Sequence, residues 1–488
     1  MRKNEEKTLK NSKLSDMLEG ISNEEYKKFG LFLSSPYFNK SRTMQQLYNI
    51  FKKYRVNNRT GSLTRKLIYN ELYPGKRYND VLLRKQLSDF TKLTGEFLID
   101  VEAKSETAKT KNLLLSSLIK RNIQRPAGQA LNELEKFYEF AQEKDNNYYY
   151  NSLQTGRLAF SYSGSGLHSP EEQISELSKR LDHYYLSLKL LFYYDILNLK
   201  LHYNKSIQFD MWGFDEIVKY IEINKQEIES DHISIYADYL SVKMLLEPAE
   251  NKHYEKLRSY IDKNKSRFVR QELEKFYVYL YNHSIYRLNR GFVKGNSELY
   301  DIIKTIDRED IPIWKFFAFH IFYINAVTNA SRAGEYEWIE SFVKRRKEYI
   351  PPAFRDETHN LAMANLYFTK KEYSEAMKYL VNVDYPNYSY YLMAKDMLIK
   401  IYWERSEPEG VLSTIEAMRK FLQRKELIPQ RLHESYTNFI NCVSRMVEPE
   451  QKDYDYEIQK LLKKEMIYAD KVWIKERLND SRRKIKNR

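Results

Sequence analysis

The chain has 488 residues, more than one hydrophobic core usually supports, so it must hold several domains or a repeat array. Hydrophobic residues make up 42% and charged residues 30%, which excludes wholesale disorder, while only 14 Gly and 12 Pro disfavour a turn-rich β fold. The net charge of +14 is concentrated at the two ends of the chain. Residues 1–100 carry 20 basic and 11 acidic side chains, and residues 460–488 carry 11 basic and 4 acidic side chains. The residues between them are nearly neutral overall.

Residues 1–104 are predicted to form a small basic helical domain. The chain starts with polar residues and no apolar stretch, so no secretory signal is expected. Ser22 and Glu25 have the spacing of a capping box and predict a helix start. Further on, Thr64 is expected to cap a short helix and Asp80 to open a longer one.

The last two of these helices carry a group of basic residues. Two helices around a turn loosely resemble a helix-turn-helix unit, in which such cations would contact phosphates. The turn is about seven residues long instead of three to four. This length favours a domain that only caps the end of an array. The candidate nucleic-acid-binding residues are Lys76, Arg77, Arg84, Lys85 and Lys92.

Residues 105–211 are predicted to be a connecting region of long helices. The segment 161–172 (SYSGSGLHSPEE) has two glycines but no Gly-Lys-Ser/Thr ending, so it does not match a phosphate-binding loop. Ser169 is expected to be the N-cap of the next helix, with Pro170 in its first turn.

Residues 212–465 are predicted to form helical repeats. Residues Leu361–Ile415 contain two copies of one predicted helical hairpin, and similar side chains recur at an interval of 35 residues. A period near 34 residues is typical of stacked helix pairs, because one pair cannot bury its apolar face alone. The recurring pairs are Leu366 and Ile401, Tyr367 and Tyr402, Phe368 and Trp403, Ala376 and Val411, and Leu380 and Ile415.

The segment from Leu361 to Leu380 resembles a tetratricopeptide repeat. Ala364 and Tyr367 occupy the small and aromatic positions of that family's helix A, and Ala376 and Leu380 match its helix B. Copies before and after it extend the resemblance over about 320–425, with larger residues at the small positions. The resemblance implies an all-α superhelix that binds a polypeptide on its concave face, without catalysis. Expected partner-binding residues are Asn325, Asn360, Asn365, Lys395 and Lys400.

Residues 466–488 are predicted to be a basic C-terminal helix or tail. The apolar stripe that begins at Ile458 and ends at Trp473 suggests one long helix leading into it. We expect this segment to be a helix that caps the array and ends in basic residues. The alternative is that its basic residues contact nucleic acid or anionic lipid electrostatically.

Motifs for chemistry are missing from the sequence. The nine histidines are separated from one another, and none has the spacing of a metal motif. Cys442 is the single cysteine, which excludes an intramolecular disulfide and a cysteine zinc site. No apolar run is long enough for a membrane span. We therefore expect a cytoplasmic protein with no cofactor and no enzymatic activity.

The sequence thus predicts an all-α superhelix with a small helical N-terminal domain. The leading functional hypothesis is a non-enzymatic scaffold that binds a polypeptide partner. The alternative is a nucleic-acid-binding regulator that uses the basic N-terminal domain, with the repeat array as sensor. The identity of the partner and the oligomeric state are left open.

Overall fold

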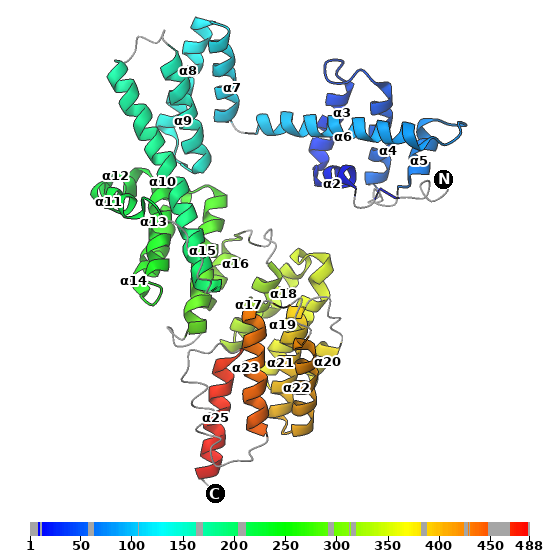
Figure 1. The fold of residues 1–488 in the computed structure, drawn as a ribbon, viewed down its shortest axis with the longest axis vertical. Coiled ribbons are helices and arrows are strands. Elements are labelled where there is room, and N and C mark those ends of the chain that lie inside the picture. The colour runs from blue at the N-terminus through cyan, green and yellow to red at the C-terminus, as the bar shows by residue number, and fades with distance from the viewer. Residues whose placement is uncertain are drawn as a thin grey trace. The chain divides into compact units, whose positions relative to one another are not determined.

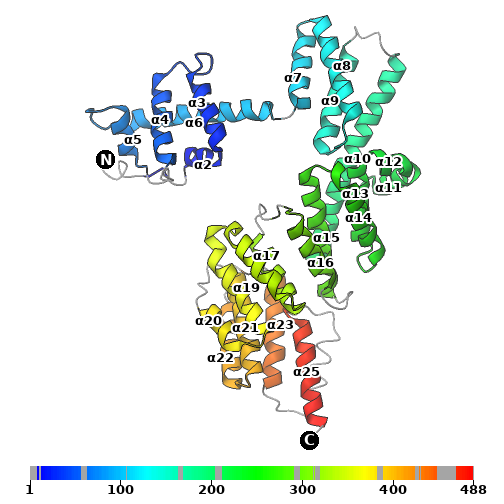
Figure 2. The ribbon, with the colours of Figure 1, turned by 180° about the vertical axis from the view of Figure 1, so that it is seen from behind.

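A computed structural model gives the fold of the chain (Figures 1 and 2). It describes residues 8–9, 12–56, 63–105, 107–162, 169–203, 211–290, 297–311, 313, 319–381, 388–423, 428, 430–447 and 469–486. These residues form 23 α-helices and no β-strand; Thr8 and Thr64 make an isolated β-bridge. The predicted all-α class is confirmed.

The chain divides into two compact units. The first comprises residues 1–141 and 147–181, and the second comprises residues 142–146 and 182–488. The long helix α10 (Pro170–Tyr203) contributes its first part to one unit and its remainder, from Asp182, to the other. The boundaries predicted near residues 104, 211 and 465 stay predictions.

The N-terminal helices of the first unit pack around α6. Each of the four preceding helices contacts α6, and a shared apolar core that includes Phe29, Phe51 and Phe90 lies between them. The rings of Phe29 and Phe51 lie 5.6 and 5.4 Å from that of Phe90. The helices are α2 (Lys13–Gly20), α3 (Asn23–Ser34), α4 (Arg42–Val56), α5 (Arg65–Leu72) and α6 (Asp80–Ala103).

Local sequence signals set the ends of these helices as predicted. The Ser22 hydroxyl accepts a hydrogen bond from the Glu25 amide, and the Glu25 carboxylate accepts one from the Ser22 amide, which completes the capping box. The Thr64 hydroxyl likewise accepts from the backbone amide of Leu67 at the start of α5.

The rest of the first unit is built from α7 (Thr107–Lys120), α8 (Gln124–Phe140), α9 (Asn146–Ser161) and the start of α10. A second apolar core forms among α7, α8 and α9. Inside it the Thr155 hydroxyl donates to Asn112 Oδ1 at 2.7 Å and lies 3.1 Å from the Tyr138 hydroxyl. The predicted cap of α10 is confirmed: Ser169 and Glu172 exchange backbone-to-side-chain hydrogen bonds.

The second unit begins with helices that surround α13. Helix α13 contacts α12, α14 and α15, and its residues from Ile233 to Val242 are buried on every side. The Asp238 carboxylate is buried there, and it is paired with Lys275 Nζ at 2.8 Å. The helices are α11 (Phe214–Ile223), α12 (Lys225–Asp231), α13 (Ile233–Leu246), α14 (Asn251–Asn264), α15 (Arg270–Arg290) and α16 (Ser297–Arg308).

The remaining helices of the second unit form successive pairs. Within the pairs, α17 packs on α18, α19 on α20 and α21 on α22; between pairs, α17 packs on α19 and α19 on α21. Helices α19, α21 and α22 run side by side in both views (Figures 1 and 2). The helices are α17 (Phe319–Arg332), α18 (Tyr336–Arg346), α19 (Arg355–Thr369), α20 (Tyr373–Val381), α21 (Tyr388–Glu404), α22 (Pro408–Leu422), α23 (Gln430–Val447) and α25 (Lys471–Lys486).

The first helix of each pair ends in the same turn. Gly334, Lys371 and Ser406 have φ of 76°, 62° and 57°, in the left-handed region. Each donates its amide to the carbonyl three residues earlier, and the next amide bonds to the carbonyl five residues earlier. This is the hydrogen-bond pattern of a Schellman C-cap. The turn recurs after 37 and then 35 residues, and the second interval equals the one between the two hairpin copies in the sequence.

The predicted repeat positions are buried in register. Val327, Ala364 and Ile399 recur in the first helices, and all three are buried. The same is true of Ile339, Ala376 and Val411 in the second helices, each no more than 1% exposed. The structure is therefore compatible with a helical-repeat fold in this region.

Two of the predicted segments fall on residues outside the described ranges. They are the glycine-containing stretch 163–168 and residues 458–468 of the predicted C-terminal helix. Within the described part, α25 carries Trp473, Ile474 and Leu478 into a core shared with α21, α22 and α23.

The three equivalent turns predict opposite effects of glycine. Lys371→Gly and Ser406→Gly should each stabilise their hairpin by up to about 1 kcal/mol, because left-handed backbone costs a residue with a Cβ about 1–2 kcal/mol. Gly334→Ala should destabilise its hairpin by about the same amount. Native-state hydrogen exchange of the flanking helices measures these changes.

The control for this series is Lys370→Gly, one residue before the left-handed position, where φ is −71°. Glycine should lower protection there, because it adds only backbone entropy to the unfolded chain. Reduced protection in both Lys371→Gly and Ser406→Gly would contradict the assignment of the turns.

Candidate functional site

The first helices of the pairs are joined by tyrosine hydroxyls. The Asn325 amide of α17 donates to the Tyr281 hydroxyl of α15 at 2.8 Å. Between the first helices of the next two pairs, the hydroxyl of Tyr323 in α17 lies 3.2 Å from His359 Nδ1 in α19. The Thr358 and Tyr390 hydroxyls, from α19 and α21, are 2.6 Å apart. These bonds satisfy polar groups inside the helix interfaces and fix the spacing of the row.

The predicted partner-binding residues have different surroundings. Asn325 uses its amide to hold α15 against α17, so its role in the structure is internal. Asn360 and Lys395 are half-buried at equivalent positions, 35 residues apart, in α19 and α21. Asn365 is half-buried one turn further along α19. Thr369 donates to the backbone carbonyl of Asn365, whereas the side-chain amides of Asn360 and Asn365 make no hydrogen bond within the described ranges.

Lys400 has a different environment from the one expected of a groove residue. Its side chain is buried, and Nζ lies 2.6 Å from a carboxylate oxygen of Asp396 and 2.8 Å from one of Asp470. Burial opposes ionisation of Asp470, but the Lys400 ammonium outweighs it and holds the pKa of this carboxyl below its usual range. The ammonium is therefore paired within the chain, and a role of Lys400 in binding a partner stays a prediction.

The contact of Lys400 with Asp470 places the C-terminal helix on α21. Asp470 directly precedes α25, and its carboxylate also accepts the backbone amide of Trp473 at 3.0 Å. The Trp473 ring lies 5.8 Å from that of Trp403, and Arg477 pairs with Glu404 at 2.9 Å. Two ion pairs and one aromatic contact thus join α21 to the start of α25.

The candidate nucleic-acid-binding residues are exposed on the first unit. Lys76 and Arg77 lie in the turn between α5 and α6, and the other three lie on α6. Arg84 is paired with Asp80, and Lys92 is 3.9 Å from Glu96. Helix α6 carries three basic and five acidic side chains. A recognition helix with this balance would meet phosphate repulsion as well as attraction, and nucleic-acid binding by these residues stays a prediction.

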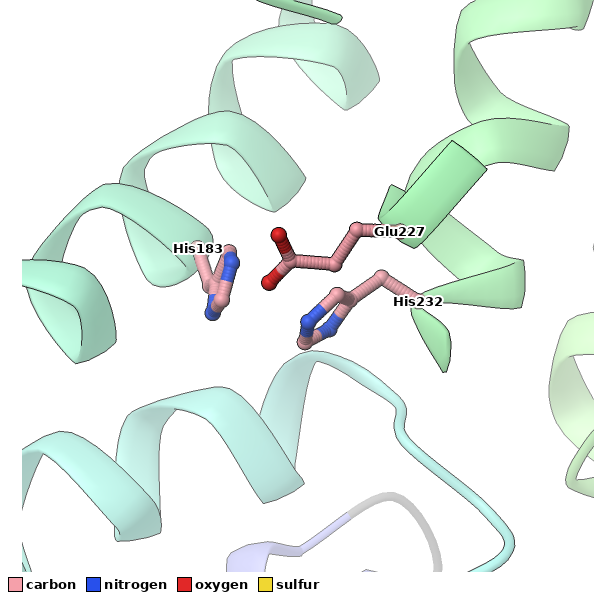
Figure 3. A group of neighbouring side chains, drawn as sticks. All are labelled: His183, Glu227 and His232. Atoms are coloured by element: carbon pink, nitrogen blue, oxygen red, sulfur yellow. The ribbon is translucent and has the colours of Figure 1, made fainter. Parts of the chain in front are cut away.

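Three side chains with metal-binding chemistry meet in the second unit: His183, Glu227 and His232 (Figure 3). His183 belongs to α10, Glu227 to α12, and His232 lies between α12 and α13. One nitrogen or oxygen atom from each lies within 4.8 Å of the other two. The imidazole centroids are 3.8 Å apart, and the Glu227 carboxylate points toward both rings (Figure 3).

The charge state of this cluster follows from burial. Removal from water, helped by the nearby His183 and Lys144 side chains, lowers the pKa of His232 to about 3. The His232 imidazole is therefore neutral at neutral pH. Burial also lowers the pKa of Lys144, whereas Asp231 and Glu227 act in the opposite direction.

Sequence motifs could not reveal this cluster. Glu227 and His232 are five residues apart across a helix end, and His183 comes from a helix 44 residues before Glu227. Metal motifs are recognised by short spacings within one element. The one local feature that the sequence offers is the break between α12 and α13, where His232 lies at a helix junction.

No family model matches the chain, and no curated protein or solved structure is significantly similar to it. Among the described helices, none combines the length and apolar character needed to cross a membrane.

The His359 contact between α17 and α19 predicts a pH dependence. Burial, helped by Lys347 and opposed by Asp356, lowers the pKa of His359 to about 4, against about 6.5 in an unfolded chain. Between these values the unfolded state binds more protons, so the free energy of unfolding should fall as pH drops from 6.5 to 4, by at most about 3 kcal/mol. Below pH 4 this loss levels off.

His359→Gln should remove this part of the pH dependence while keeping an acceptor for the Tyr323 hydroxyl. Hydrogen exchange of α17 and α19 at several pH values measures it. At pH 7.5 both side chains are neutral, so the difference in the free energy of unfolding between variant and parent reports packing alone. If the two stability curves stay parallel from pH 7.5 to pH 4, His359 is not buried at this interface.

Proposed function

We propose that the protein is a non-enzymatic scaffold that binds a polypeptide partner along the first helices of its tetratricopeptide-like pairs, α17, α19 and α21. These helices pack on one another in sequence order, which sets equivalent side chains next to each other. Helical repeats of this kind offer extended surfaces for a bound chain, and their function depends on which residues face it.

The observation that carries the proposal is the docking of the C-terminal helix on α21. Lys400 accommodates the Asp470 carboxylate, and Trp403 contacts Trp473. Asn365 is the equivalent of Lys400 on the neighbouring helix α19. The same repeat position therefore contacts a segment of the chain on α21, through Lys400. On α19 it carries the half-buried Asn365, whose side-chain amide makes no hydrogen bond within the described ranges.

The partner chemistry follows from the side chains of the row. The side-chain amides of Asn360 and Asn365 can both donate to and accept from an extended backbone, and Lys395 can pair with an acidic side chain. The Lys395 ammonium lies 5.5 Å from the Tyr391 ring, a contact that holds the long side chain in place. We therefore propose an extended or helical segment with acidic and aromatic residues as the ligand.

A photo-crosslinking amino acid tests this proposal in cells. Placed at Asn365 or Lys395, it should form an adduct that protease removes and nuclease leaves intact. The matched control is Ser374, which is exposed on the second helix of the same pair. Equal adducts at all three positions, or none at Asn365 and Lys395, would contradict binding along the row.

The same experiment separates the alternative hypothesis. A crosslinker at Lys85, which is exposed on α6, should give no nucleic-acid adduct, because the carboxylates of this helix outnumber its cations. A nuclease-sensitive adduct there would favour the nucleic-acid-binding regulator.

A further inference from the structure

We infer that His183, Glu227 and His232 form a binding site for a zinc-class divalent metal ion that ties α10 to the junction of α12 and α13. These residues lie far along the chain from the proposed partner-binding row, and metal binding by them does not depend on that function. The geometry of the three donors, their chemistry and the backbone around them support the site.

The geometry requires little movement. Ligand atoms around a tetrahedral zinc ion with bonds of about 2.0–2.2 Å are about 3.4 Å apart. The three donors here already lie within 4.8 Å of one another. Glu227 is exposed, so its carboxylate can close the remaining distance without disturbing the core. Its orientation toward both imidazoles is the one that coordination needs (Figure 3).

The donor set selects the class of ion. Two imidazoles and one carboxylate suit zinc and related late transition metals, whereas magnesium and calcium prefer oxygen ligands. Three protein ligands leave a fourth position for water in a tetrahedral site. The exposed Glu227 side of the cluster gives solvent and ions a path to it.

The backbone holds the buried ligand in place. The His232 amide donates to the Ile228 carbonyl at 3.1 Å and closes α12, while the His232 carbonyl accepts the Tyr236 amide at 3.1 Å in the first turn of α13. Both bonds are made by helix termini, so the backbone of this residue is fixed before any ion arrives. His183 lies within the long helix α10. Such fixed donors lower the cost of forming a site.

Lys144 makes the site different from an ordinary histidine pair. Its ammonium interacts electrostatically with both Glu227 and His232, so it attracts the carboxylate that a metal would bind and repels the ion itself. Neutralising Lys144 should tighten metal binding, which a cluster held together only by internal contacts would not do.

Cobalt(II) is the probe, because its visible absorption reports coordination by nitrogen and oxygen ligands. The full chain, stripped of metal with a chelator, should bind one equivalent of Co²⁺ with visible bands that Zn²⁺ abolishes. Glu227→Gln and His183→Gln should each weaken binding at least about tenfold, since removal of a ligand costs no less than removal of its supporting partner. Lys144→Met should strengthen it.

His253→Gln is the matched control, because His253 Nε2 lies 3.3 Å from Glu247 in the same unit, and among the described residues this pair belongs to no group of three metal-binding side chains. This variant should bind Co²⁺ like the parent. Circular dichroism checks that each variant folds, and the exposed position of Glu227 makes its variant the most informative one. Absence of stoichiometric Co²⁺ binding by the parent overturns the inference, and so does binding that survives both Glu227→Gln and His183→Gln.

Discussion

A helical hairpin leaves one apolar flank uncovered, and the second unit of this protein depends on covering that flank with the next hairpin. Helix α19 illustrates the constraint, since it packs on its own partner α20 and also on α17 and α21. Small or branched apolar residues recur inside the pairs, and tyrosine hydroxyls bond across the interfaces between them. Tyrosine suits such a position because it adds a large apolar surface and a hydroxyl that finds a partner.

Local signals and the repeat period could be predicted from the sequence because each depends on residues close together in the chain. The capping box of Ser22 and Glu25, the cap at Ser169, and the hairpins of Leu361–Ile415 are of this kind. The environment of Lys400 could not be predicted, because the carboxylate of Asp470 comes from 70 residues away. Lysine is also almost never buried unless it is paired, so its default expectation is exposure.

The buried charges show how the chain joins helices that are distant in sequence. Asp307 of α16 is held by Arg345 and Arg346 of α18, with contacts between 2.8 and 3.0 Å. Lys400 joins α21 to the start of α25 in the same manner. Enclosed ion pairs of this type add little net stability, but removal of one partner leaves a charge uncompensated, so they favour one arrangement of helices over others.

A double-mutant cycle between Thr358→Val and Tyr390→Phe tests the stacking of α19 on α21 most directly. The hydroxyls are 2.6 Å apart in a buried interface, so the stability losses from the two substitutions should be non-additive by about 1 kcal/mol. Hydrogen exchange in the two helices gives the values for both single variants and the double variant. Strict additivity would mean that the hydroxyls do not meet, and it would contradict the packing of successive first helices on which this account is built.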